Sequence, residues 1–141
     1  MTDEELIIKH FENDGYVKLS GITLVELTKE KAVASAKIGK EHLNANGSVQ
    51  GGMLYTLADF EIAVHANFLH PATVTQGGHI QYIRAAITSE ITATAKETVR
   101  AGHNTISEVI IRDDKDEIVC VCNFNGFVKD IDKEILRKKY E

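Results

Sequence analysis

The segment from residue 42 to residue 59 holds the residues whose types and spacing could do chemistry. Gly51 and Gly52 stand side by side just before a long apolar run. A glycine pair at the start of a helix leaves backbone N–H groups unblocked at the positive end of the helix dipole. Such groups bind an anion, or the oxyanion that develops when a carbonyl is attacked. The alternative is that the two glycines serve only close packing.

Asp59 is the second reactive feature, because it is a carboxylate inside the same apolar run. An unpaired carboxylate is costly to bury, so Asp59 must reach a partner, a cleft or a subunit interface. In a cleft its pKa would be tuned by its surroundings, and it could act as a base or a nucleophile. The alternative is that Asp59 caps a loop or joins an ordinary salt bridge.

The apolar run itself predicts a central helix that positions both features. The run extends from about Gly51 to Leu69, ends before Pro71, and is apolar nearly all round, as expected of a buried helix. The Asn-, Gly- and Ser-rich stretch from Glu41 to Gln50 predicts the loop that leads into it.

Strand-like patterns surround this helix. Two strands are predicted before it, at Tyr16–Leu27 and over residues 32–38, joined by a turn at Lys29 and Glu30. The alternate alanines of the second strand suggest that a helix packs close against them. Four more strands follow as a meander, at Thr73–Arg84, Glu90–Val99, Asn104–Arg112 and Ile118–Val128. This order predicts an α+β domain in which an antiparallel sheet of about six strands wraps around one long helix.

Length and composition predict a single domain over residues 1–141, with 43% hydrophobic and 26% charged residues. A capping box at Thr2 and Glu5 begins a short N-terminal helix over residues 2–13, and the tail over residues 130–141 is expected to be a short exposed helix.

Charge and cysteine usage exclude several classes of function. The net charge is −5 and the basic residues are scattered, which argues against a nucleic-acid partner. No apolar run approaches the roughly 18 residues of a membrane span, and the acidic N-terminus is unlike a signal peptide. Cys120 and Cys122 share one face of a strand and are expected to be inert thiols rather than reactive groups or ligands. The histidines lack metal-ligand spacing, so we predict a cytoplasmic protein without a metal site.

The chemically interesting segment resembles the signature of the phenylacetyl-CoA thioesterase branch of the hotdog superfamily. That signature reads His-x-Asn-x-x-Gly-x-x-His-Gly-Gly, followed after six residues by Asp, often as Leu-Ala-Asp. The chain matches it at the positions His42, Asn44, Gly47, Gly51, Gly52 and Asp59. The resemblance covers roughly residues 16–128 and implies a hotdog fold.

The resemblance also implies a function and an assembly. It implies hydrolysis of acyl-CoA without a cofactor, in a homodimer joined edge to edge and often paired again into a tetramer. In such enzymes the N–H matching Gly51 holds the thioester oxygen, and the carboxylate matching Asp59, from the neighbouring subunit, acts as nucleophile or activates water. Asn44 matches a residue that positions water or substrate, and Thr75 matches a hydroxyl that supports the carboxylate.

The remaining matches, His42, Gly47 and Gly52, are assigned to substrate binding. Arg84 is added as a candidate for the CoA phosphates, although scattered basic residues on strands are more often solvated surface. Tyr55, Phe60, Phe68 and Tyr82 could shape an aryl or medium-chain acyl pocket, or could simply fill the core.

The chain departs from the signature at Gln50, where the family has histidine. A glutamine can donate a hydrogen bond to a carbonyl or to a leaving sulfur, but it does not titrate. Two further functions therefore stay open. The first is a non-catalytic acyl-CoA-binding protein, and the second is a hotdog dehydratase, whose catalytic histidine is not found in this pattern. A transcription regulator is disfavoured, because the roughly 15 residues before Tyr16 are too few for a DNA-binding module.

Overall fold

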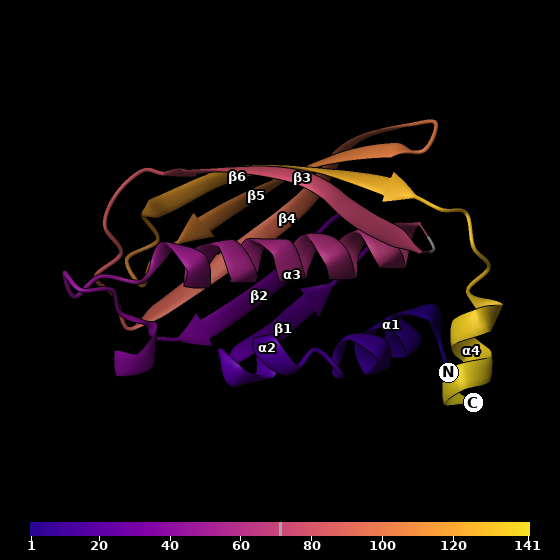
Figure 1. Ribbon diagram of the computed structural model, residues 1–141, viewed down its shortest axis with the longest axis horizontal. Coiled ribbons are helices and arrows are strands. Elements are labelled where there is room, and N and C mark those ends of the chain that lie inside the picture. The colour runs from indigo at the N-terminus through magenta and orange to yellow at the C-terminus, as the bar shows by residue number, and fades with distance from the viewer. Residues whose placement is uncertain (71) are drawn as a thin grey trace.

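The computed structural model describes residues 1–70 and 72–141 and shows one antiparallel sheet with a long helix against it (Figure 1). Pro71, which was expected to end the central helix, lies outside the described residues. The helices and strands, in chain order, are α1 (Asp3–Phe11), α2 (Gly15–Leu19), β1 (Ile22–Leu27), β2 (Ala32–Lys37), α3 (Gly51–Leu69), β3 (Thr73–Tyr82), β4 (Glu90–Ala101), β5 (Asn104–Arg112), β6 (Ile118–Val128) and α4 (Glu134–Tyr140).

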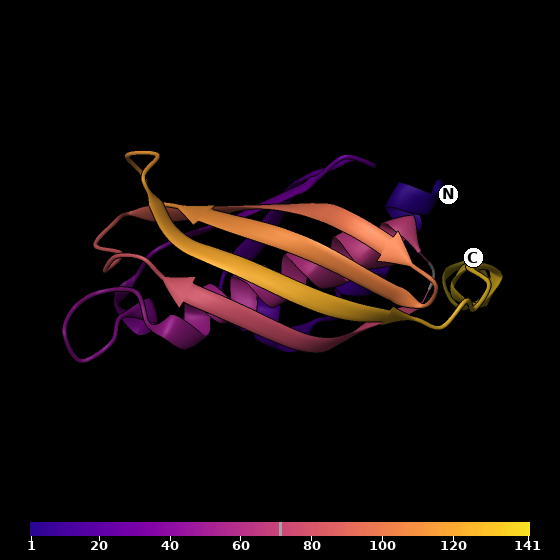
Figure 2. The same cartoon turned by 90° about the horizontal axis from the view of Figure 1, so that it is seen from above.

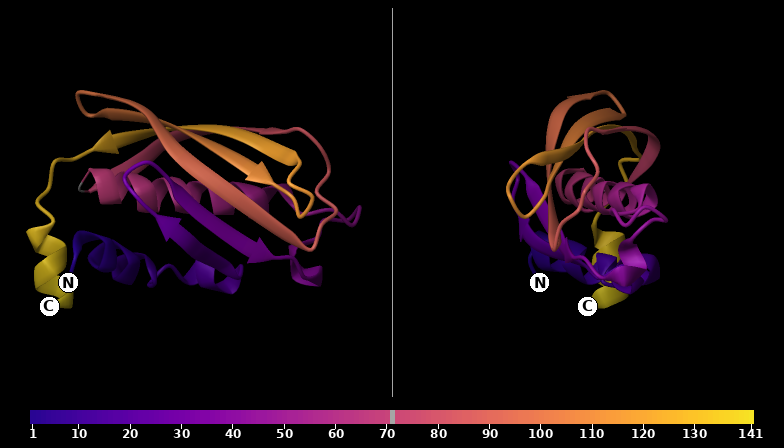
Figure 3. Two further views of the ribbon diagram at one scale, coloured as in Figure 1. Left: turned by 180° about the vertical axis from the view of Figure 1, so that it is seen from behind. Right: turned by 90° about the vertical axis from the view of Figure 1, so that its left-hand side faces the viewer.

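The six strands are ordered β1-β2-β4-β5-β6-β3, and each adjacent pair is antiparallel. The sheet lies over α3 in the view from above (Figure 2) and curves around it in the end view (Figure 3). The predicted α+β layout, six strands wrapped around one central helix, is therefore confirmed. The strand order leaves β1 and β3 as the two edges of the sheet.

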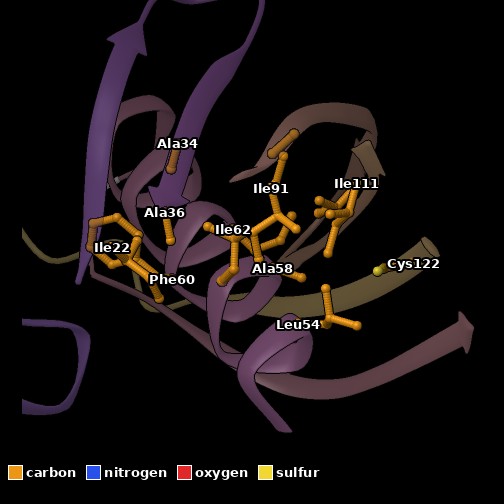
Figure 4. Packing of buried hydrophobic residues seen from close by; sticks show 14 of the residues in the cluster. Ile22, Ala34, Ala36, Leu54, Ala58, Phe60, Ile62, Ile91, Ile111 and Cys122 are labelled. Carbon is orange, nitrogen blue, oxygen red and sulfur yellow. The ribbon is translucent and has the colours of Figure 1, made fainter. Parts of the chain in front are cut away.

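Small side chains let α3 approach the sheet closely. Ala34 of β2 pairs with Ala93 of β4, and the inward-facing alanines of these two strands are all buried, namely Ala32, Ala34, Ala36, Ala93 and Ala95. Larger side chains of α3 and the other strands fill the remaining space, as Figure 4 shows for Leu54, Ile62, Ile91 and Ile111. The prediction that a helix packs against the alanine face is confirmed.

The predicted strand at Tyr16–Leu27 is partly wrong, because its first residues form α2. The Asp14 carboxylate accepts a hydrogen bond from the Val17 N–H at 3.1 Å and so caps a new helical turn. Gly21, with φ +72°, then reverses the chain before β1 begins at Ile22.

The two terminal helices pack against each other, and both chain ends lie on the same side of the molecule (Figure 1). Thr2 and Glu5 form the predicted capping box of α1. The Tyr140 hydroxyl of α4 bonds His10 Nδ1 at 3.0 Å and accepts from Asn13 Nδ2 at 3.0 Å. The tail is largely exposed, as predicted, although Leu136 packs against the core.

Two expectations drawn from composition can be compared with the structure. No helix in residues 1–70 and 72–141 is long and apolar enough to cross a membrane. Cys120 and Cys122 are both buried and unbonded to each other. Burial raises the pKa of the Cys120 thiol to about 11 and, with smaller contributions from nearby acidic groups, that of Cys122 to about 12. Both are therefore un-ionised at neutral pH, as expected of inert thiols.

Candidate active site

One stripe of α3 stays partly exposed, whereas the other residues of the helix up to Ala66 are buried, except Gly52 and Thr56. Its residues recur every four positions, which places them on one helix face, and they are Gly51, Tyr55, Asp59, Ala63 and Asn67. The stripe faces the edge strand β3. The Tyr82 hydroxyl donates to the Gly51 carbonyl at 3.2 Å, and Asn67 bonds the backbone of Thr73. Both residues proposed for catalysis, Gly51 and Asp59, are therefore brought onto the same face.

The N-terminus of α3 is built to leave backbone donors free. Gln50 is the N-cap, and its side-chain oxygen accepts a hydrogen bond from the Met53 N–H at 3.2 Å. This fold-back requires glycine at position 52, because a Cβ there would lie 2.6 Å from Gln50 Oε1. The Gly51 and Gly52 N–H groups open the helix and have no acceptor within it, so they can bind an oxyanion.

A cavity of about 430 Å³ opens beside this helix end. It is lined by Asn44, Gly51, Tyr82 and Arg84, among others. The Arg84 guanidinium bonds the Glu117 carboxylate at 2.7 Å and remains about half exposed. A free N–H donor and a cation therefore share one cavity.

The loop before α3 is held by two of the predicted site residues. Asn44 donates to Ser48 Oγ at 2.9 Å, and its side-chain oxygen accepts from the N–H groups of Asn46 and Ser48. The buried His42 ring accepts from the Gly39 N–H at Nδ1, so Nε2 carries the proton and donates to the Ser20 carbonyl. Gly47 turns the loop with φ +83°. Contacts of these residues with a substrate stay predictions.

Asp59 lines a second cavity, of about 440 Å³, at the other end of the stripe. Thr75 of β3 lies in the same cavity, as do Phe11 of α1 and Ile131 of the tail. Burial raises the pKa of Asp59, the hydrogen bond from Thr75 opposes that rise, and the Asp14 charge adds to it. Of the three expected surroundings of Asp59, a partner, a cleft or a subunit interface, the structure shows a cleft, which Thr75 also lines. The supporting role of Thr75 stays a prediction.

Within one chain, Gly51 and Asp59 line two separate cavities. Gly51 and Asp59 are separated by eight helical residues, which is about 12 Å along the axis. A reacting carbonyl needs an oxyanion donor and a base each within about 3 Å. The two groups can act on one carbonyl only if a second copy brings its own Asp59 to Gly51.

Glu61 is a second carboxylate on α3, and its surroundings were not predicted from the sequence. It is completely buried, and neither of its oxygens has a hydrogen-bond partner by geometry among the described residues. Burial raises its pKa well above the ordinary value, and the nearby backbone of Ala34 opposes this only weakly. Among residues 1–70 and 72–141, no group of three or more His, Cys, Asp or Glu side chains could hold a metal.

Comparisons with known proteins identify relatives of this chain. No family model matches it. It is 31% identical over 87 residues to the acyl-coenzyme A thioesterase PaaI of Escherichia coli, an alignment that spans 61% of this chain and 62% of that protein. It is also 31% identical over 96 residues to a putative esterase of Archaeoglobus fulgidus, over 67% of this chain and 62% of the relative. The alignments thus span less than two thirds of either relative.

Solved structures show the same fold over most of the chain. The PaaI protein of the E. coli phenylacetic acid degradation operon aligns with a TM-score of 0.82 at 22% identity, over 90% of this chain and 96% of that one. A hypothetical thioesterase of Streptococcus pneumoniae, solved with coenzyme A, aligns with a TM-score of 0.80 at 22% identity, over 87% and 97%. The chain therefore has the hotdog fold, and over part of its length its sequence is similar to that of an acyl-coenzyme A thioesterase, in line with the resemblance seen in its signature segment.

Proposed function

We propose that this protein hydrolyses acyl-CoA thioesters to the free acid and CoA, in active sites shared between two copies of the chain. The observation that carries the proposal is that the stripe holds two half-sites, the free N–H groups at Gly51 and a carboxylate of raised pKa at Asp59. The 31% identity to an acyl-CoA thioesterase supports the same reaction.

The chemistry follows from the two halves. The thioester oxygen accepts a hydrogen bond from the Gly51 N–H of one copy, which stabilises the negative charge that develops on attack. Asp59 of the other copy removes a proton from the attacking water, or attacks the carbonyl itself. The carbon–sulfur bond then breaks and the CoA thiolate takes up a proton. The Arg84 cation beside the Gly51 cavity is suited to a CoA phosphate.

The second copy is expected to add to the sheet at β3. This strand is an edge, and its residues from Val74 to Gly78 are exposed. Tyr82 lies over Gly51, and Thr75 lies beside Asp59. Antiparallel pairing of β3 with its copy therefore brings the Thr75 end of one strand to the Tyr82 end of the other. The resulting dimer, alone or paired into a tetramer, holds two equal sites.

The reaction is tested by thiol release from a panel of aryl, short-chain and medium-chain acyl-CoAs. Wild-type turnover that disappears in Asp59→Ala supports the hydrolase and reveals its acyl preference. If acyl-CoA binds but no member of the panel turns over, the chain is a binding protein instead. Gln50 makes this second function worth testing, because the chain lacks the imidazole of the signature at that position.

The shared site is tested by mixing two inactive variants. Gly51→Pro removes the N–H donor at a helix position that tolerates proline, and Gly51→Ala is its matched control, because it keeps the N–H and adds a Cβ at the same 3.2 Å from Tyr82. Refolding Gly51→Pro together with Asp59→Ala gives hybrid dimers with one intact site, so about a quarter of wild-type activity returns. No recovery on mixing would mean that each site lies within one chain.

A further inference from the structure

Tyr55 belongs to the α3 stripe and lies one turn after Gly51 and one turn before Asp59. Its ring packs against Phe124 of β6, with the ring centroids 5.5 Å apart. Its hydroxyl points under Gly78 of β3, since a Cβ built on Gly78 would lie 2.5 Å from the Tyr55 oxygen. Glycine at position 78 therefore makes the room that this phenol oxygen occupies.

The Tyr55 hydroxyl has no hydrogen-bond partner among residues 1–70 and 72–141. Burial raises the pKa of this phenol, and the negative charge of Asp59 raises it further. The group is therefore a neutral hydrogen-bond donor in the neighbourhood of Asp59. Tyrosine hydroxyls in partly buried sites usually have a partner, which directs attention to what meets this one in the assembled protein.

The symmetry of the proposed dimer places Tyr55 between the two reaction centres. A twofold axis that brings Gly51 beside Asp59 of the second copy must pass beside α3, level with the midpoint between these residues, which is Tyr55. Along the helix axis, the Tyr55 position is then offset by about 6 Å from its own Asp59 and by a similar amount from that of the neighbouring copy. A single water molecule spans such a gap with two hydrogen bonds.

We propose that the Tyr55 hydroxyl is a catalytic group that holds the attacking water for Asp59, an inference that rests on the proposed thioesterase function. Tyr55 donates its hydrogen bond to the water oxygen, and the Asp59 carboxylate accepts one water proton. The water oxygen forms the new bond to the thioester carbon, the carbon–sulfur bond breaks, and the Asp59 proton passes to the CoA sulfur. Asn44, the residue that the signature assigns to water, keeps only one amide hydrogen outside its loop.

The test compares Tyr55→Phe with the wild-type protein in steady-state thiol release. Phenylalanine keeps the ring and its Phe124 contact and removes only the oxygen, so folding is preserved. We expect kcat to fall about tenfold while KM changes less than about twofold, because the lost hydrogen bond acts on the water and not on the thioester. Binding of a non-hydrolysable thioether analogue of the substrate is expected to stay unchanged.

The matched control is Tyr16→Phe, which removes a hydroxyl from a tyrosine that is 64% exposed on α2. It is expected to leave kcat and KM at wild-type values. An unchanged kcat in Tyr55→Phe, or a rise in KM alone, overturns the role of Tyr55 and leaves the thioesterase intact. A wild-type protein that releases no thiol from any acyl-CoA overturns both proposals.

Discussion

Two carboxylates stand two residues apart on the same helix, and their surroundings make them different groups. Asp59 lies on the partly exposed stripe of α3, in a cavity with Thr75. Glu61 points to the opposite side, toward the sheet, and is completely buried. Burial raises the pKa of both, but a hydrogen bond from Thr75 keeps Asp59 closer to its ordinary value.

The difference shows that coverage by the sheet, and not position along the chain, decides which acid can do chemistry. Residues two positions apart on a helix are rotated by about 200° from each other, so Asp59 and Glu61 cannot face the same neighbours. Asp59 can meet a substrate, whereas burial in the core disfavours the ionised form of Glu61. Replacing each acid in turn should therefore separate activity from stability.

The largest expected effect is the loss of activity in Asp59→Asn. This change keeps the shape of the side chain but removes the base or nucleophile, so kcat should fall by a factor of about 100 or more. The free energy of unfolding, measured by urea denaturation at pH 7, should stay the same or rise slightly, because a half-buried charge is removed. Glu61→Gln should instead keep a kcat close to that of the wild type. If Glu61→Gln were as inactive as Asp59→Asn, the conclusion that only Asp59 takes part in the reaction would be wrong.

The next effect concerns stability and its dependence on pH. Because the folded pKa of Glu61 is raised, its favourable contribution is complete below the unfolded value of 4.5 and is lost as pH rises through the folded pKa. Glu61→Gln does not titrate, so at pH 8 it should be about 1–3 kcal/mol more stable than the wild type, with little difference at pH 4.5. Urea denaturation of both proteins at the two pH values measures this, and an advantage that stays constant with pH would contradict it.

The contrast between the two acids was only partly predictable from the sequence. The i, i+4, i+8 spacing of Gly51, Tyr55 and Asp59 is visible in the sequence and already places them on one face of a helix. The sequence does not show which face of this helix packs against the sheet, because α3 is apolar nearly all round and the spacing of its apolar residues singles out no face. The burial of Glu61 therefore emerged only from the structure.

The fold was predicted well from the sequence wherever a helical or strand-like pattern extends over many residues. The six strands and the central helix were predicted from alternation and from a run of apolar residues. The helix α2 was missed because Asn13-Asp14-Gly15 has the composition of a break, whereas one hydrogen bond that Asp14 accepts from the Val17 N–H is enough to start a new turn. The distance between Gly51 and Asp59 follows from their spacing in the predicted helix, but the two cavities that they line could not be predicted, because side chains from β3, α1 and the tail complete them.

A smaller effect is expected from Thr75, which sharpens the account of Asp59. Its hydrogen bond lowers the pKa of Asp59 against the effect of burial. Activity requires the ionised carboxylate, so kcat/KM should fall as the pH drops through this pKa. In Thr75→Ala the pKa of Asp59 is higher, so the fall in kcat/KM should begin at a pH that is higher by about one unit or less. Thr75→Ser, which keeps the hydroxyl, is the matched control for pH–rate profiles from pH 4 to 8. An acid limb that stays in place in Thr75→Ala would show that the hydroxyl does not bond Asp59 in the working enzyme.

The smallest effect is expected at Gln50, at the other half-site. The side-chain oxygen of Gln50 is occupied by the Met53 N–H, so only its amide N–H groups can face a thioester, and they do not titrate. The wild-type profile of kcat should therefore lack a limb near the ordinary histidine pKa of about 6.5. Gln50→His should change kcat by about threefold or less at pH 7 while introducing that limb, because an imidazole at this position loses or gains its proton there. If the pH profile of kcat shows a limb near pH 6.5 in the wild-type protein, and the same limb in Asp59→Glu, then a group other than Gln50 and Asp59 titrates in the active site.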